Sequence, residues 1–282
     1  LRSLHPEDLD RVVEIDNAIA GRSRRGFFEK RLEVAQASPE AFITTAALDG
    51  DNLIGYAFAR IQQGEFGGST KVAILDVVAV DPTTQSKGVG KSLIAGIEER
   101  MKKNSIGSMR SQTEWTDTAM TRFFAATGFQ LEPRQILIRD CSALDVEEES
   151  VDGEDYIPLS RDRFNVRSFE EKDVDAIARI DSKLTGDDRS DYYATKAKEV
   201  LGESGIRVSL VAESDGIIVG FMMARVDYGE FGKTEPTAAI DTFGVHPGFS
   251  GNGVGHALMS QLLANLGILH VENVRTQVRN DN

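Results

Sequence analysis

The amino-acid sequence predicts an α/β protein built from two tandem copies of one domain. Residues 73–80 form a nearly continuous apolar run rich in Val and Ile, which is typical of a buried strand. A glycine-rich turn follows this run, and apolar residues at helical spacing come after the turn. The same order returns at 238–258, and a chain of 282 residues is long enough for about two domains.

The two copies are related by a constant offset of 165 residues, the separation of Gly88 and Gly253 (253 − 88). The offset also pairs Asp76 with Asp241, and it places identical Gly-Glu-Phe-Gly segments at 64–67 and 229–232. A constant offset over this span indicates a duplicated domain rather than a solenoid, whose repeats are roughly 20–50 residues long.

Local patterns predict the elements of the first copy in order. Pro6 and the acidic residues after it mark the start of the first helix, Asp49-Gly50-Asp51-Asn52 is a hairpin turn, and Gly128 ends the last helix. We expect strands at 2–4, 42–48, 53–61, 73–80, 108–114 and 134–139, and helices from Pro6, at 27–37, at 91–103 and at 117–127. The second copy repeats this order from Phe164.

These elements give two domains, at 1–140 and 163–282, joined by an acidic linker at 141–162. Asn282 corresponds to Asp117 of the first copy, so the second copy has no counterpart of the later helix and strand. We expect the natural chain to continue past Asn282 with such a pair. The alternatives are a disordered tail or a swapped element in its place.

Composition limits the classes of function. The formal net charge of −13 argues against general nucleic-acid binding and is compatible with a cationic amine substrate, although many proteins are simply acidic. A single cysteine, Cys141, allows no intrachain disulfide and favours a reducing compartment, so we expect the cytoplasm. No apolar run approaches the ~20 residues of a membrane span, and the four scattered histidines indicate no metal site.

The turn after the first central strand can be compared with three phosphate-binding patterns. A dinucleotide fingerprint needs glycine where Leu93 stands, and a P-loop needs glycine where Gln85 stands. The third pattern, Gln/Arg-x-x-Gly-x-Gly/Ala after a strand, is matched by Gln85-Ser86-Lys87-Gly88-Val89-Gly90. This match resembles the pyrophosphate loop of the GNAT superfamily, the acyl-CoA-dependent N-acyltransferases. Taken alone, the motif could also be an ordinary glycine-rich turn between a strand and a helix. The repeat of the motif at 250–255 makes that alternative weaker.

The resemblance implies two GNAT-like domains, α/β in class and α+β by sheet type. Each would have a mixed, mostly antiparallel sheet of about six or seven strands with helices on both faces. Acetyl-CoA would lie where the central strand and the next strand splay apart. The resemblance assigns to this co-substrate Val78, Val80, Gln85, Ser86, Lys87, Gly88, Val89, Gly90, Lys91, Ser92, Val245, Ser250, Gly251, Asn252, Gly253, Val254, Gly255 and His256.

The implied activity is N-acetyl transfer to an amine by direct attack in a ternary complex, without a metal. The candidate catalytic residues are Asp76 and Asp241, which are acids in apolar strands, and Glu65 and Glu230, in loops that resemble the family's acceptor edge. Each acid has a structural or solvated alternative. Phe124 stands where the family often has a tyrosine acid. A degenerate tandem that binds acyl-CoA or serves as a scaffold or sensor is therefore the alternative function.

Two differences between the copies predict different ligand preferences. Arg22-Ser23-Arg24-Arg25 corresponds to Asp187-Asp188-Arg189-Ser190, in a loop that walls the acceptor site in the family, so we expect different amine acceptors. Gln85, Lys87 and Lys91 correspond to Ser250, Asn252 and His256, so we expect the first copy to bind acetyl-CoA about one to two powers of ten more tightly. An oligomer is compatible with the sequence.

Overall fold

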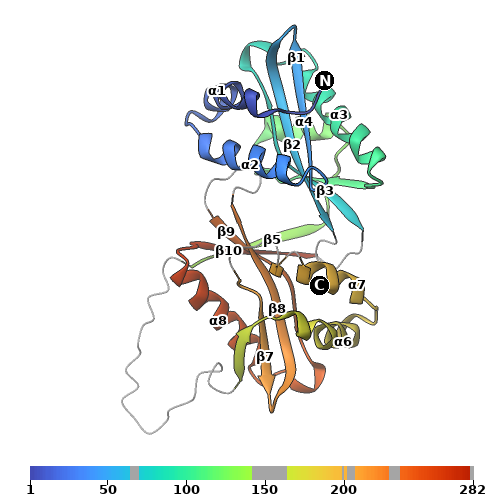
Figure 1. Cartoon of the computed structure of the whole chain (residues 1–282), viewed down its shortest axis with the longest axis vertical. Coiled ribbons are helices and arrows are strands. Elements are labelled where there is room, and N and C mark those ends of the chain that lie inside the picture. Colours follow the sequence, from blue (N-terminus) through green and yellow to red (C-terminus); the bar gives the residue numbers. More distant parts are fainter. Residues whose placement is uncertain (64–69, 142–163, 199, 202–206, 229–235, 280–282) are drawn as a thin grey trace. The chain divides into compact units, whose positions relative to one another are not determined.

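The computed structural model describes residues 1–63, 70–141, 164–198, 200–201, 207–228 and 236–279. These residues separate into two compact units that divide between Glu132 and Pro133. Each unit is a sheet with helices packed on it (Figure 1), which confirms the predicted fold class. The acidic linker predicted at 141–162 lies outside the described residues except for Cys141, which is buried in the second unit.

The first unit has a four-stranded sheet in the order β1-β2-β3-β4, fewer than the six or seven strands expected, because the segment at 2–4 forms a single bridge and β5 pairs in the second unit. The first three strands are antiparallel, and β4 runs parallel to β3. The strand predicted at 2–4 is reduced to a single bridge between Arg2 and Ala46. The elements of this unit are α1 (Leu9–Ala20), α2 (Arg25–Ala37), β1 (Phe42–Asp49), β2 (Asn52–Gln63), β3 (Lys71–Val80), α3 (Val89–Lys103), β4 (Ser108–Arg110) and α4 (Thr118–Ala126).

Alternation along β2 divides the interior of the first unit between the two faces of its sheet. Tyr56 and Phe58 lie in a cluster with α1 and α2, whereas Ala57 and Ala59 lie in a cluster with α3. Small residues on the second face let α3 pack close to the strands. Burial of each large apolar side chain contributes about 1.5–3 kcal/mol, so these two layers stabilise the sheet from both faces.

The second unit has a six-stranded sheet in the order β5-β10-β9-β8-β7-β6. Its α6 and α7 share one apolar cluster, and α8 lies in the other. The elements are β5 (Arg134–Asp140), β6 (Asn165–Ser168), α6 (Val174–Thr185), α7 (Ser190–Lys198), β7 (Leu210–Ser214), β8 (Ile217–Tyr228), β9 (Pro236–Val245), α8 (Val254–Ile268) and β10 (Asn273–Arg279).

Strand β5 belongs to the second unit, although the sequence predicts it as the last strand of the first domain. It pairs antiparallel with β10 along its whole length, from Arg134 opposite Arg279 to Asp140 opposite Asn273 (Figure 1). The boundary between the units therefore falls before β5 and not at 140. Because an unpaired strand edge leaves backbone N–H and C=O groups without partners, β10 gains a full ladder from this pairing.

Candidate active site

In both units the central strand parts from its parallel neighbour after three residue pairs. β3 pairs with β4 only at 72–74, and β9 pairs with β10 only at 237–239, while β3 continues to Val80 and β9 to Val245. A side-chain hydroxyl accompanies the end of each ladder. Ser111 Oγ donates to Leu75 O (3.0 Å), and Thr276 Oγ1 donates to Ile240 O (3.1 Å). The splay expected between these strands is therefore present in both copies.

In the first unit, the start of α3 has the properties of an anion site. Gly88 is its N-cap at φ 83°, no side chain caps the helix, and its first turn has no acidic residue. The N–H groups of that turn are therefore available to a ligand, and the helix start is partly positive. Lys87 and Lys91 are exposed, and neither forms an ion pair with any residue that the structure describes.

The second unit repeats the backbone of this site without its cations. Gly251 and Gly253 have φ values of 78° and 90°, matching Ser86 (65°) and Gly88. The start of α8 also has neither a side-chain cap nor an acidic residue in its first turn. The exposed side chains are polar or imidazole groups at Ser250, Asn252 and His256. Its attraction for a pyrophosphate therefore depends mainly on backbone N–H groups.

The second glycine of each loop also lies against an aromatic side chain. A Cβ on Gly90 would lie only 2.8 Å from Cε2 of Phe123, on α4. A Cβ on Gly255 would lie 2.9 Å from Cζ of Phe243, on β9. An aromatic ring therefore lies against the first helical turn in both units, and it comes from a different element in each.

The other predicted loop residues come together at these helix starts, but several side chains are engaged within the protein. Gln85 Nε2 donates to Val80 O (3.3 Å), and Ser92 Oγ donates to Gly88 O (3.3 Å). Val89 and Val254 pack into their apolar cores. A ligand would therefore meet mainly the backbone of this segment together with the two lysines. Val78, Val80 and Val245 are half-buried on the central strands beside it.

Asp76 lies at a β-bulge and is held by two arginines. Phe58 pairs with Val77 while the next residue, Ala59, pairs with Leu75, so Asp76 has no residue opposite it. Its side chain is only 1% exposed. It accepts hydrogen bonds from Arg60 Nε (2.6 Å) and Nη2 (3.1 Å), and Arg31 Nη2 lies 3.5 Å from Oδ2.

The second unit holds an equivalent ion cluster. Asp241, 3% exposed, pairs with Arg225, and Lys196 Nζ lies 3.4 Å from its Oδ2. The sequence analysis did not identify the basic partners. The signal was present in the repeat, because the 165-residue offset pairs Arg60 with Arg225 and Arg31 with Lys196. Both strand acids are therefore centres of buried ion clusters beside the splay.

The side chains expected to exchange protons with the substrates are only partly found among the described residues. Glu65 and Glu230 lie outside them. Phe124, which replaces the expected tyrosine, packs its ring 4.8 Å from that of Phe129. Tyr56 does not take its place, because its hydroxyl is buried in the α1–α2 core and burial raises its pKa far above the usual value.

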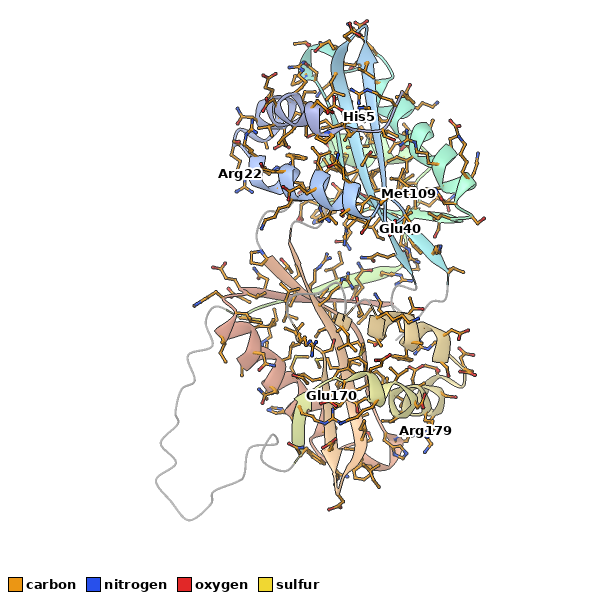
Figure 2. The ribbon with its side chains drawn as sticks, in the orientation of Figure 1. His5, Arg22, Glu40, Met109, Glu170 and Arg179 are labelled. Carbon is orange, nitrogen blue, oxygen red and sulfur yellow. The ribbon has the colours of Figure 1, made fainter. Side chains whose placement is uncertain are left out.

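The loop after α1 contains one structural arginine and one free charge. Arg24 Nε donates to Asp16 Oδ2 (2.9 Å), and this hydrogen bond raises the pKa of Arg24. The same contact recurs between Arg189 Nε and Asp181 Oδ2 (2.6 Å). Arg22, in contrast, is exposed at the turn between α1 and α2 (Figure 2). Arg25 is exposed as well, but it pairs with Asp10. Of the loop arginines predicted to select the acceptor, Arg22 is therefore the exposed one that forms no ion pair with the residues that the structure describes.

Among the described residues, no group of His, Cys, Asp or Glu side chains could hold a metal ion. None of the helices there combines the length and apolar character needed to cross a membrane.

Comparison with known proteins agrees with the geometry of both units. The family model described as Acetyltransferase (GNAT) family matches residues 9–129 and 174–282. A mycothiol acetyltransferase of Brachybacterium faecium is 27% identical over 124 residues, which are 44% of this chain and 36% of that protein.

Among solved structures, the chain is similar to a GCN5-related glucosamine N-acetyltransferase region of a fungal multi-domain GH3 beta-N-acetylglucosaminidase. The TM-score is 0.67 at 13% identity, over 97% of this chain and 34% of that one. A tandem GNAT protein from the clavulanic acid biosynthesis pathway gives a TM-score of 0.59 at 17% identity, over 99% of this chain and 90% of that one.

The present chain thus spans about a third of the length of the mycothiol acetyltransferase and of the fungal protein. The solved structures support the fold, and the family model covers most of both units. The chain therefore belongs to the GNAT family of acetyltransferases, as two tandem copies of the GNAT domain.

Proposed function

We propose that the first unit transfers an acetyl group from acetyl-CoA to an amine. The observation that carries this proposal is the uncapped start of α3, flanked by Lys87 and Lys91, at the end of the strand that parts from β4. The helix start that would attract an anion therefore lies next to the opening between β3 and β4. An acyl thioester carried on a pyrophosphate-bearing chain has the two features that such a place would recognise.

The backbone of residues 86–91 would hold the pyrophosphate, and the lysines would add charge-assisted contacts. The pantetheine amides would pair with backbone groups of Val78 and Val80 on β3. Gln85 would have to release the carbonyl of Val80 for this pairing, after which its amide could turn toward the phosphates. Binding therefore exchanges one internal hydrogen bond for contacts with the ligand.

The reaction would be a direct acyl transfer. The amine nitrogen attacks the thioester carbonyl, the C–S bond breaks, and the sulfur leaves as a thiolate, while the amine's proton passes to a base or through water. We propose Glu65 as that base and Glu230 as its counterpart in the second copy. Asp76 and Asp241 were candidates for the same role. Their ion pairs favour a positioning role, because a base must have a lone pair free for the proton.

The second unit fits the alternative function better than the first unit does. It lacks lysines at its anion site, and it uses β5 to complete its sheet. We propose that it serves mainly as a scaffold, and that acetyl-CoA binds chiefly to the first unit.

Matched charge reversals test this assignment. Lys87→Glu/Lys91→Glu in the first unit corresponds to Asn252→Glu/His256→Glu in the second. These positions lie just before the N-cap glycine or in the first helical turn, where an acid does not disfavour the helix, so folding should survive while phosphates are repelled. Calorimetry should show that acetyl-CoA binding is lost in the first pair and retained in the second. A CoA-release assay with an amine panel that includes glucosamine should follow the same order. Loss of binding in the second pair alone would contradict the proposal.

A further inference from the structure

The two units place different side chains against the first turn of the helix at the anion site. In the first unit this place is taken by Phe123, which comes from α4. The place over Gly255 is taken instead by Phe243, which comes from the central strand β9 itself.

Phe243 has the position that Val78 has in the first unit, at the 165-residue offset. Val78 is half-buried and packs against the core under α3, and valine is too short to bridge from the strand to the helix start. The phenylalanine ring does bridge it, with Cζ 2.9 Å from the point where a Cβ on Gly255 would lie. Phe243 nevertheless remains 49% exposed, although it lies on the central strand of the sheet.

We propose that Phe243 closes the acyl-CoA route of the second unit. This inference rests on the proposed function, in which the pantetheine chain runs along the strand from the helix start to the splay. A ring that reaches the first turn of α8 from β9 itself would lie across that run, whereas Phe123 reaches the first turn of α3 from α4 and leaves the strand uncovered by its ring. The backbone anion site at 250–256 is then intact but disconnected from the splay beside Asp241. Phe243 thus acts as a specificity-determining residue that limits the chain to one acyl-CoA site.

The closure depends on the bulk of one side chain, so it can be removed by substitution. Phe243→Val restores the residue of the first unit at this position, and Phe243→Tyr keeps the ring as a matched control. Half of the phenylalanine is already exposed, so its loss should be tolerated by the fold. Circular dichroism and thermal unfolding of each variant verify that it is.

The experiment is calorimetric titration of the full chain with acetyl-CoA. We expect one site in the unaltered protein and in Phe243→Tyr, and two sites in Phe243→Val. The new site should be at least about tenfold weaker than the first, because it lacks both lysines. Adding Asn252→Glu/His256→Glu to Phe243→Val should remove the new site alone.

Failure of this inference can be distinguished from failure of the proposed function. A single site in folded Phe243→Val, or two sites in the unaltered protein with one removed by Asn252→Glu/His256→Glu, would overturn the closure. If Lys87→Glu/Lys91→Glu left binding intact, the assignment of the first unit would fall instead. A new site that appears in Phe243→Val and is sensitive to Asn252→Glu/His256→Glu would still support the closure in that case. The reciprocal Val78→Phe should abolish binding to the first unit.

Discussion

The Asp76→Asn variant tests whether this carboxylate stabilises the first unit beside the opening between β3 and β4 or acts as the catalytic base. The side chain is 1% exposed and is bound by Arg60 and Arg31, which are themselves largely buried. Opposite charges about 4 Å apart contribute roughly 4 kcal/mol at an effective dielectric constant of 20. Removing one partner of a buried ion pair costs about 3–5 kcal/mol, because the remaining charge stays buried. We therefore expect Asp76→Asn to lower the free energy of unfolding of the first unit by about 3–5 kcal/mol.

Hydrogen exchange measured on each unit suits this test, since a protein of two units need not unfold in one step. Asp76→Asn should lower the protection of β2 and β3 and leave β8 unchanged. The matched variant Asp241→Asn should do the reverse. Adding Arg60→Gln to Asp76→Asn should recover part of the loss, because it removes one of the uncompensated cations. The double-mutant cycle should therefore show a clear coupling between the two positions.

The pH profile of the reaction separates the two roles of Asp76. A base must be deprotonated, so activity falls on the acid side of its pKa, and removal of the base abolishes that fall. If Asp76 is an anchor, Asp76→Asn lowers kcat/KM but keeps the acid limb of the profile. An Asp76→Asn variant of unchanged stability that has lost the acid limb would refute the anchoring argument.

Three further changes test the remaining assignments. Arg22→Glu should alter the preference among amine acceptors without loss of stability. Arg24→Glu should instead destabilise the first unit by about 3–5 kcal/mol, because it breaks the buried pair with Asp16. Equal effects of the two variants on thermal unfolding would contradict this distinction. Glu65→Gln should lower kcat by about 10²–10⁴-fold, whereas Glu230→Gln should leave kcat unchanged. An unchanged kcat in Glu65→Gln would exclude Glu65 as the base. Ile136 and Gln277 lie opposite each other on β5 and β10, so cysteines at these two positions should form a disulfide within one chain. A cysteine pair at Ile136 and Asn273 is the control and should not. A disulfide found only between chains would show that β5 is exchanged between molecules.

The sequence was sufficient to predict features that depend on short segments of backbone. The loops at 85–92 and 250–256 were predictable because a left-handed residue and a helix start leave a local glycine pattern. The duplicated sheet was predictable because strand, turn and helix recur at one offset. None of these features requires knowledge of what lies next to them in space.

Features that depend on distant partners were not predictable in the same way. The apolar pattern of β5 identifies a strand but not the edge with which it pairs, because β4 and β10 have equivalent places in their sheets. A strand acid such as Asp76 has the same local pattern whether it is free or bound. Its partners on α2 and β2 come from 45 and 16 positions earlier in the chain (76 − 31 and 76 − 60), which no periodicity connects.

Comparison of the two copies nevertheless separates structural groups from groups that a ligand would contact. The pair Asp16–Arg24 recurs as Asp181–Arg189, and the hydroxyl of Ser111 recurs in Thr276. Both sets act inside each unit, and losing either would leave buried polar groups without partners, so a duplicated domain retains them. Other differences fall at exposed or half-buried positions near the helix starts and in the loop after α1, where Lys87 becomes Asn252, Val78 becomes Phe243 and Arg22 becomes Asp187. Changes there cost little in folding but alter what can bind. The positions at which the copies differ are therefore where the specificity of this chain should be sought, and the most direct single test among them is Phe243.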